Sequence, residues 1–420
     1  MDQRMNKFRL AILLLGVCSA FLFIAEAGAE EDLFDSLDSA LEAQFQELDA
    51  ELEAQYQALD KALKEAYERL EGEVEETWGV DEVELPSKAI WVDYSEDNQL
   101  RRKIDFEKGI IEIEHILTDQ TEVDKVVAAM QVAAASIATD RVADLAAKDS
   151  ALKYAREQLE AENISLQEYK SDDPRPVLGS IGADVPDSQE MNQLVSSVLT
   201  DKAKKGSSGN VKASLTGLSN NKKKVTIQVP LRLGYQTTLA SRYRESVIRE
   251  AQRHDLPASL VYAVIETESS FNPRARSPVP AFGLMQLVPR SGGMDAYNHV
   301  YGEKLLLDPE YLYDAEQNVE LGAAYLNLLY TRYLRHIKNP ESRQYCTIAA
   351  YNTGAGNVAR TFVGSNNVRE AAKTINNMTP QAVYDYLVAN LPHEETRNYL
   401  QKVTKAQAKY SSMDQYVSTD

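Results

Sequence analysis

The chain contains 420 residues, of which 44% are hydrophobic and 26% are charged. These values are ordinary for globular proteins, and they exclude a wholly disordered chain, a collagen and a polytopic membrane protein. The formal net charge of −19 argues against binding nucleic acid through a basic face, so no nucleic-acid partner is expected. The length suggests two or three domains, and the two cysteines, Cys18 and Cys346, are too few for a disulfide framework.

The N-terminus predicts an export signal. Three basic residues between positions 4 and 9 precede an apolar run from Leu10 to Ile24, and Ala27-Gly28-Ala29 offers a cleavage site of the A-x-A type. The run is short for a membrane-spanning helix, which needs about 20 apolar residues. We therefore predict a signal peptide at residues 1–29. An uncleaved anchor and a lipoprotein modified at Cys18 are alternatives, although Val17 is a poor residue before a lipidated cysteine.

Residues 30–86 hold most of the negative charge, with 20 Asp and Glu against 3 Lys and Arg. Apolar residues between Leu41 and Trp78 recur in steps of four, three and four, which is an eleven-residue period. This period predicts one long, acidic, coiled-coil-like helix with a nearly straight apolar stripe. Such a stripe must be covered by another copy or by another part of this chain. We predict self-association through residues 33–78.

The rest of the chain divides into two further modules. Residues 87–238 combine a hairpin around 103–114, a long helical stretch near 122–162 and a strand at 225–231, which indicates an α+β accessory domain. No catalytic constellation stands out in this segment. Residues 239–420 are predicted to be nearly all helix, with prolines at or just before several expected helix starts. The chain as a whole is therefore expected to be α+β.

Three short stretches of the helical module combine polar and small residues with apolar surroundings, at residues 268–273 (ESSFNP), 283–289 (GLMQLVP) and 350–356 (AYNTGAG). A carboxylate at the end of an apolar helix is a candidate general acid, because desolvation raises its pKa. Glu266 and Glu268 both qualify, but residues two apart on a helix differ by about 200° and cannot face one site. Asn272-Pro273 ends the helix just after Glu268, which favours Glu268.

No metal site or cofactor is predicted. The five histidines lack the i, i+4 pairing that is typical of metal ligands on a helix. Cys346 lies in an apolar stretch without an adjacent histidine, which favours a buried structural thiol over a nucleophile.

In order and composition, the three stretches resemble the motifs of lytic murein transglycosylases with an Slt-type catalytic domain. A fourth motif of that family, Glu-Thr-Arg-x-Tyr, matches residues 395–399. Residues 375–380 and 94–113 are also similar to the membrane-bound C branch of the family, including its accessory domain. The resemblance implies a goose-lysozyme-like all-α fold for residues 239–420 and a location in the periplasm of a Gram-negative bacterium. It allows membrane association without requiring it.

The resemblance also implies a reaction. Peptidoglycan glycan strands would be cleaved at the β-1,4 bond between N-acetylmuramic acid and N-acetylglucosamine without water. Glu268 aligns with the family's single catalytic acid, and it would protonate the glycosidic oxygen and then take the proton of the C6 hydroxyl. The muramyl N-acetyl group would replace a second carboxylate, and the product would be a 1,6-anhydro sugar.

Six further positions match substrate-binding residues of the family, namely Ser277, Gln286, Tyr351, Asn352, Glu395 and Tyr399. Some have simpler interpretations: Ser277 as a turn residue, Tyr351 as a core aromatic, and Glu395 as a first-turn residue favoured by the helix dipole. Pro280 stands where many relatives have Gly, which affects the loop before Gly283.

Two other functions fit the same sequence. A goose-lysozyme-like hydrolase would need a second carboxylate to position water, for example Asp295 or Glu303. A non-catalytic peptidoglycan-binding scaffold would use the repeat helix to assemble and the helical module to hold glycan, and an intact Glu268 argues against it.

Overall fold

The computed structural model describes residues 30–166, 169–178, 183–200, 205–218, 222–278 and 280–417, with side chains from residue 47 onward. The predicted signal peptide, residues 1–29, lies outside the described residues. The chain divides into two compact units, residues 1–54 and 55–420. None of the helices within the described ranges combines the length and the apolar character that a membrane crossing requires.

The acidic repeat forms the helix α2 (Glu30–Trp78), as its eleven-residue period predicts. From residue 55 onward, the stripe positions are buried and the positions between them are mostly exposed. The buried stripe consists of Tyr56, Leu59, Leu63, Tyr67, Leu70, Val74 and Trp78. Over this stretch the stripe is covered by other parts of the same chain, one of the two possibilities that the sequence pattern leaves open.

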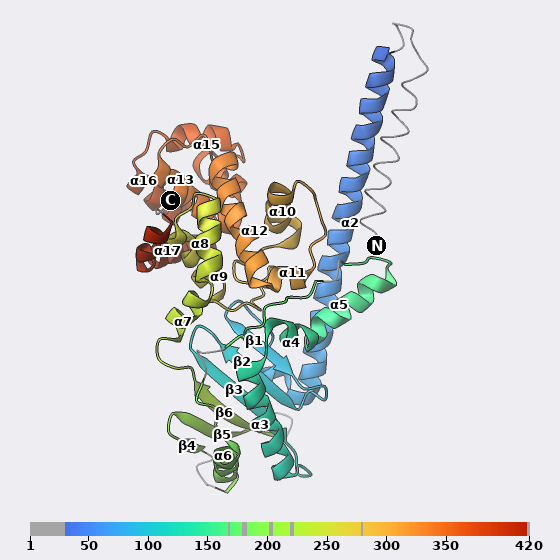
Figure 1. Ribbon diagram of the computed structural model, residues 1–420, viewed down its shortest axis with the longest axis vertical. Coiled ribbons are helices and arrows are strands. Elements are labelled where there is room, and N and C mark those ends of the chain that lie inside the picture. The colour runs from blue at the N-terminus through green and yellow to red at the C-terminus, as the bar shows by residue number, and fades with distance from the viewer. Residues whose placement is uncertain are drawn as a thin grey trace. The chain divides into compact units, whose positions relative to one another are not determined.

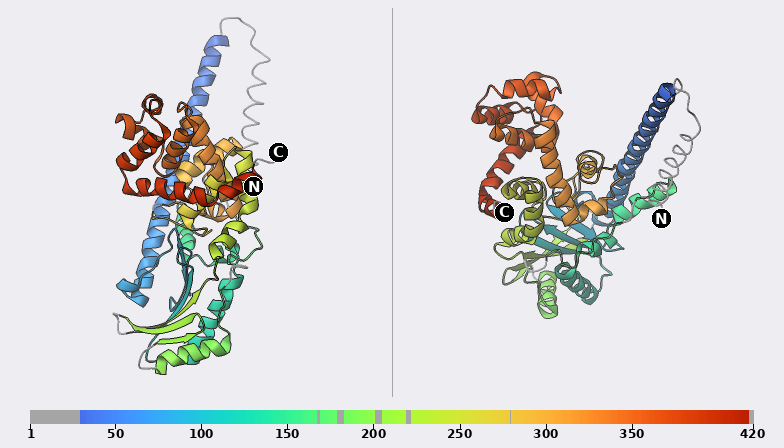
Figure 2. Two further views of the ribbon diagram at one scale, coloured as in Figure 1. Left: turned by 90° about the vertical axis from the view of Figure 1, so that its left-hand side faces the viewer. Right: turned by 45° about the horizontal axis from the view of Figure 1, so that its top comes forward.

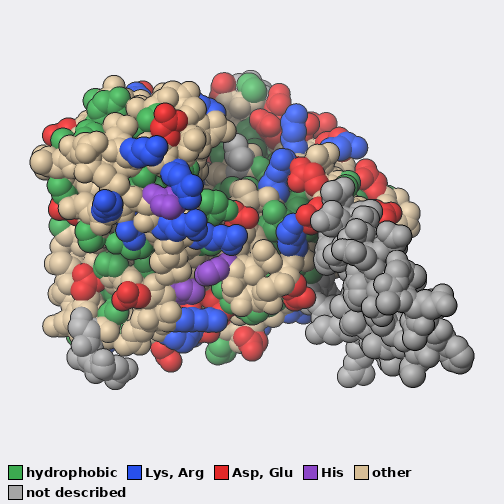
Figure 3. Space-filling view, turned by 90° about the horizontal axis from the view of Figure 1, so that it is seen from above, with side chains coloured by type: hydrophobic (Ala, Val, Ile, Leu, Met, Phe, Trp, Pro, Cys, Tyr) green, Lys and Arg blue, Asp and Glu red, His purple; other side chains and the backbone are tan. Residues whose placement is uncertain are grey.

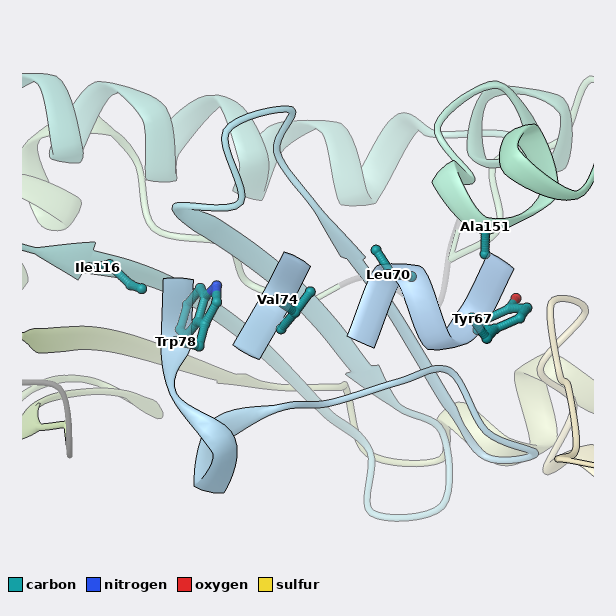
Figure 4. Close-up of a cluster of buried hydrophobic side chains, with 6 residues drawn as sticks. All are labelled: Tyr67, Leu70, Val74, Trp78, Ile116 and Ala151. Carbon is teal, nitrogen blue, oxygen red and sulfur yellow. The ribbon is translucent and has the colours of Figure 1, made fainter. Parts of the chain in front are cut away.

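A hydrophobic cluster shows what covers the stripe. Tyr67, Leu70, Val74 and Trp78 pack with Ile116 of the sheet and with Ala151 (Figure 4). Burying one large apolar side chain contributes about 1.5–3 kcal/mol. The end of α2 is therefore part of the core of the neighbouring module.

The accessory module is built on one antiparallel sheet in the order β1-β2-β3-β6-β5-β4. The strands are β1 (Ile90–Tyr94), β2 (Leu100–Asp105), β3 (Ile110–Leu117), β4 (Lys205–Ser208), β5 (Val211–Gly217) and β6 (Lys223–Pro230). The predicted hairpin is confirmed, because β2 and β3 pair in register and Gly109 takes the positive φ of 69° in the turn between them. The predicted last strand is confirmed as β6, which pairs with β3 in the middle of the sheet.

Helices cover one face of this sheet. They are α3 (Val123–Thr139) and α6 (Ser188–Thr200), with α4 (Val142–Ala147) and α5 (Ser150–Ala161) following α3 in the chain (Figure 1). The helical stretch predicted near residues 122–162 is confirmed as α3, α4 and α5, which are separated at two aspartates. Asp140 is buried against Arg102 of the sheet, and Asp149 caps α5 by accepting a hydrogen bond from the backbone of Leu152.

The end of α2 packs on the other face (Figure 2). The Trp78 ring lies 4.3 Å from the Arg101 guanidinium, and its Nε1 donates a 2.6 Å hydrogen bond to the carbonyl of Asn98. Arg101 is fully buried and pairs with the Glu114 carboxylate on the adjacent strand. The buried guanidinium also donates to the carbonyl of Glu82 and lies within 4.0 Å of the Glu82 and Glu84 carboxylates, so several partners offset the cost of burying its charge.

The C-terminal module is helical, as predicted, so the α+β class of the whole chain is confirmed. Its helices are α7 (Tyr235–Arg242), α8 (Arg244–Arg253), α9 (Ala258–Ser269), α10 (Met294–Tyr301), α11 (Pro309–Tyr313), α12 (Ala315–Leu328), α13 (Pro340–Thr353), α14 (Ala355–Val363), α15 (Val368–Ile375), α16 (Pro380–Asn390) and α17 (Glu394–Lys409). Ten of the twelve residues of α9 are buried, which makes it the central helix, and it packs on α8 and α17. On the face seen in Figure 3, basic, acidic and histidine side chains are interspersed with apolar ones.

Candidate active site

The buried helix α9 ends at Ser269, one residue after Glu268, the predicted catalytic residue. Ser270 and Phe271 follow with positive φ angles of 52° and 66°, which reverse the chain directly after the last turn. Phe271 is buried between the rings of Tyr243, Tyr262 and Tyr410. This aromatic anchor holds the helix end, so the last-turn side chains have defined positions.

The Glu268 side chain is almost completely enclosed, with 4% of the residue exposed. Burial raises the pKa of its carboxyl group above the usual value for glutamate. The Lys88 ammonium and the Tyr399 hydroxyl oppose this by lowering the pKa, while the Glu395 carboxylate adds to the increase. The balance favours the protonated carboxyl, which is the form that a general acid needs.

Glu266 has different surroundings. Its carboxylate accepts hydrogen bonds from Lys409 Nζ, at 2.8 Å, and from the Tyr410 hydroxyl at the end of α17. The two glutamates thus face different partners, as their spacing on a helix requires. Glu266 is engaged in a partly exposed ion pair, and Glu268 is the enclosed one.

Two buried tyrosines from different helices approach Glu268. Tyr351 of α13 donates a 2.8 Å hydrogen bond to the carbonyl of Met285, in the GLMQLVP stretch. The Tyr399 hydroxyl of α17 makes no regular hydrogen bond to another described residue, yet it is close enough to lower the pKa of Glu268. Burial and the Glu268 charge raise the pKa of both phenols well above 10, so both hydroxyls remain protonated donors.

The fourth motif connects α13 and α17. The Thr396 hydroxyl donates a 2.7 Å hydrogen bond to the side-chain oxygen of Asn352. Thr396 is buried and Asn352 is half-buried. This bond fixes the orientation of the Asn352 amide, which follows Tyr351 near the C-terminal end of α13.

The loop between α9 and α10 contains Ser277 and Gln286. Gln286 takes a positive φ of 49°, and its side-chain amide donates to the carbonyls of Ala275 and Gly283, at 2.9 and 3.1 Å. Its Oε1 is buried without a hydrogen-bond partner among the described residues. Ser277 is half-buried, and its backbone N–H donates to the carbonyl of Ala281. In this structure Gln286 braces the loop, and a role of either residue toward substrate stays a prediction.

Sequence reasoning missed one residue of this site. Lys88, in the segment before β1, places its Nζ 3.3 Å from Glu268 Oε2 and 3.5 Å from Glu395 Oε1. Glu395 itself is largely exposed, with 73% of its side chain accessible. A lysine two residues after a proline in an extended segment matches no motif. Lys88 is 180 residues from Glu268 in the sequence, and only the fold places the two side chains together.

The two carboxylates considered for a hydrolase have other neighbours. Asp295 of α10 accepts a hydrogen bond from the Tyr333 hydroxyl, and Glu303 is exposed near Tyr297. The charges that act most strongly on Glu268 are those of Lys88 and Glu395. Within the described ranges no cluster of His, Cys, Asp and Glu could hold a metal ion. Cys346 is buried, and burial raises the pKa of its thiol to about 12.

Comparison with known proteins identifies two matched regions. Residues 245–375 match the transglycosylase SLT domain family, and residues 56–155 match the N-terminal domain of membrane-bound lytic murein transglycosylase C. The second match begins at Tyr56, where the α2 stripe becomes buried.

Relatives match most of the chain. Membrane-bound lytic murein transglycosylase C of Pectobacterium atrosepticum is 34% identical over 339 residues, covering 80% of this chain and 87% of the relative. The protein of the same name from Actinobacillus succinogenes is 30% identical, with 80% and 86% covered. Among solved structures, an inactive mutant of the lytic transglycosylase Slt from Pseudomonas aeruginosa is 28% identical over 40% of this chain and 24% of that one, with a TM-score of 0.32.

Proposed function

The chain belongs to the family of membrane-bound lytic murein transglycosylase C and is a peptidoglycan-cleaving lyase, and from this premise we propose the bond it cleaves, the product and the residue that acts. The bond is the β-1,4 linkage between N-acetylmuramic acid and N-acetylglucosamine in murein glycan strands. The product ends in 1,6-anhydro-N-acetylmuramic acid. Glu268 is the single residue that acts first as general acid and then as general base.

In the first step, Glu268 donates its proton to the glycosidic oxygen as the bond from that oxygen to C1 of the muramyl residue breaks. The observation that carries this assignment is the enclosure of Glu268, because burial raises its pKa and keeps the proton available. The carbonyl oxygen of the muramyl N-acetyl group attacks C1 and replaces the leaving group. No second carboxylate is required for this step.

In the second step, the Glu268 carboxylate takes the proton of the C6 hydroxyl of the same sugar. The C6 oxygen then bonds to C1, and the bond between C1 and the N-acetyl oxygen breaks. Glu268 ends protonated, as it began, and no water is consumed. The charged groups that act on the pKa of Glu268 are the Lys88 ammonium, 3.3 Å from its Oε2, and the exposed Glu395 carboxylate.

The side chains around Glu268 are suited to hold a sugar. The Tyr351, Asn352 and Tyr399 side chains come from α13 and α17, and each has a position defined by burial or by a hydrogen bond. We propose that they contact the glycan, together with Glu395, Ser277 and Gln286. Buried, oriented hydroxyl and amide groups supply the few polar contacts that fix a ligand's orientation.

We also propose where the protein works. The export signal predicted at residues 1–29 and the membrane-bound relatives support a location in the Gram-negative cell envelope, in the periplasm. Self-association through residues 33–78 also stays a proposal. Its apolar stripe is covered by the chain itself from Tyr56 onward, and Leu48 before that point is half exposed.

Digestion in water labelled with oxygen-18 tests the reaction type. Purified sacculi are treated with the full-length protein, and the released fragments are analysed by mass spectrometry. The proposal predicts products without the label at the muramyl C1, because the C6 oxygen closes on that carbon. Incorporation of one labelled oxygen per new end would show a hydrolase and overturn the proposal.

A further inference from the structure

A segment of the accessory module reaches the catalytic centre. Residues 83–89 lead from the short 3-10 turn after α2 (Val80–Glu82) into β1, and their backbone is held from both sides. The Asn272 side-chain amide donates to the carbonyl of Lys88, at 3.3 Å, and the backbone N–H of Arg276 donates to the carbonyl of Ser87, at 3.4 Å. On the accessory side, the N–H of Ser87 donates to the carbonyl of Ile90 at 2.8 Å.

The loop that receives this segment is itself attached to the accessory module. Arg274, with 3% of the residue exposed, forms 2.8 Å ion pairs with Glu310 of the helical module and with Asp149 at the start of α5. A buried guanidinium with two carboxylate partners has little freedom. The position of the Lys88 backbone is therefore determined by two independent attachments.

The Lys88 ammonium lies between two carboxylates. It is 3.3 Å from Glu268 Oε2 and 3.5 Å from Glu395 Oε1. Burial of Lys88 opposes its charge, but the two carboxylates outweigh this and raise its pKa, so it remains an ammonium. The titratable groups that act on Glu268 from the surrounding elements are Lys88, Tyr399, Glu395 and Tyr351. Lys88 is the only cation in this set.

We propose that Lys88 is a positioning residue contributed by the accessory module. Its ammonium holds the Glu268 side chain in place and stabilises the anion that forms when Glu268 gives up its proton. Glu395 limits this effect because it shares the same ammonium. The inference rests on the proposed role of Glu268 as acid and base. It gives the accessory module a direct part in the reaction. A general acid at the end of an apolar helix would otherwise resist losing its proton, and the second step requires the carboxylate.

The two neighbours of Glu268 act in opposite directions, which makes the inference testable. Replacing Lys88 by Met removes the cation that favours the anion, so the pKa of Glu268 rises. Replacing the exposed Glu395 by Gln removes the anion that opposes it, so the pKa of Glu268 falls. Activity that needs protonated Glu268 is lost as the pH rises through this pKa, and kcat/KM reports the pKa of the free enzyme.

The experiment measures kcat and KM from pH 4 to pH 9 with a soluble tetrasaccharide of alternating N-acetylglucosamine and N-acetylmuramic acid. The variants are Lys88→Met, Lys88→Arg and Glu395→Gln in the full chain. Lys125→Met is the control, because it removes the same charge from an exposed lysine of α3 that pairs only with Glu122 on the surface. Thermal unfolding of each variant accompanies the kinetics.

The expected result is a pair of opposite shifts. In Lys88→Met the alkaline limb of the kcat/KM profile moves to higher pH, and kcat falls by about tenfold. This loss is smaller than the roughly 10²–10⁴-fold that general acid–base catalysis as a whole contributes, because Glu268 itself is retained. In Glu395→Gln the limb moves to lower pH. Lys88→Arg retains the wild-type limb, and Lys125→Met leaves kcat, KM and the limb unchanged.

Two results would overturn the inference. One is an unchanged alkaline limb in both Lys88→Met and Glu395→Gln, and the other is a Lys88→Met enzyme that is faster than wild type at every pH, which would make Lys88 a block of the site. Glu395→Gln keeps the test decisive if Lys88→Met does not fold, since Glu395 is exposed. Glu268→Gln is measured in parallel: if it retains activity, the proposed function fails instead.

Discussion

The side-chain oxygen of Asn352 accepts a 2.7 Å hydrogen bond from the hydroxyl of Thr396. This contact joins the third and fourth sequence motifs, which are 44 positions apart in the chain. It places α17, with Tyr399 and Glu395, in a defined position relative to α13, with Tyr351. The arrangement around Glu268 therefore depends on a bond between two residues that are not themselves acids or bases.

Replacing Thr396 by Val removes this bond while keeping the side-chain volume. We expect a loss of about 1–3 kcal/mol in the free energy of unfolding, because the half-buried Asn352 oxygen loses its partner. We also expect kcat to fall more than the fraction of folded protein does. Thr404→Val on the same helix is the matched control, because its hydroxyl bonds only to the carbonyl of Leu400 in its own helix. Equal effects of the two substitutions on kcat would contradict this role.

The enclosure of Glu268 predicts a pH-dependent effect on stability. Its pKa is raised in the folded protein above the value of 4.5 of an exposed glutamate, so its protonated form is favoured by folding. The contribution is fully present below pH 4.5 and is lost as the pH rises through the folded pKa. Glu268→Gln should therefore have a higher Tm than wild type at pH 8, and the difference should shrink on going to pH 4. A Glu268→Gln protein that is less stable than wild type at pH 8 would show that Lys88 outweighs burial.

Trp78 connects the long helix to the accessory sheet. It is fully buried, stacks on Arg101 and donates to the carbonyl of Asn98. Trp78→Ala should cost about 3–5 kcal/mol, the usual range for removing a large buried aromatic side chain. Val80→Ala, two residues later and 65% exposed, is the control and should leave the stability nearly unchanged. Chemical denaturation measures both, and a small effect of Trp78→Ala would mean that the end of α2 is not part of the cooperative unit.

Cys346 should be inert in the folded protein. The thiol is buried in α13, and burial raises its pKa to about 12, so very little thiolate forms at pH 8. Iodoacetamide should modify Cys346 only after denaturant unfolds the protein, as followed by mass spectrometry of its peptide. Rapid modification without denaturant would indicate that α13 opens locally, and would place doubt on the rigidity of Tyr351.

Some of this could be predicted from the sequence for physical reasons. The eleven-residue period of α2 appears as buried positions from Tyr56 to Trp78, because a helix repeats its contacts at that spacing. The sequence favours Glu268 over Glu266 as the candidate acid because the helix is expected to end just after it; α9 ends at Ser269, and Glu268 is the enclosed one of the two. These features depend on contacts that are local in the chain.

What could not be predicted depends on contacts between distant segments. Lys88 looks like any lysine in an extended segment, and it reaches Glu268 only because the accessory sheet docks on the loop after α9. The helical stretch predicted near residues 122–162 is divided at Asp140, which pairs with Arg102, and at Asp149, which caps α5. The apolar stripe of α2 does not show in the sequence whether this chain or a second copy covers it.

The measurement that tests the central claim most directly is mass spectrometry of the fragments that the full-length protein releases from purified sacculi. Wild type and Glu268→Gln are compared, with Glu266→Gln as the matched control two residues away. The account predicts fragments that end in 1,6-anhydro-N-acetylmuramic acid from wild type and Glu266→Gln, and none from Glu268→Gln. Reducing-end N-acetylmuramic acid from wild type, or anhydro fragments from Glu268→Gln at the wild-type rate, would contradict it.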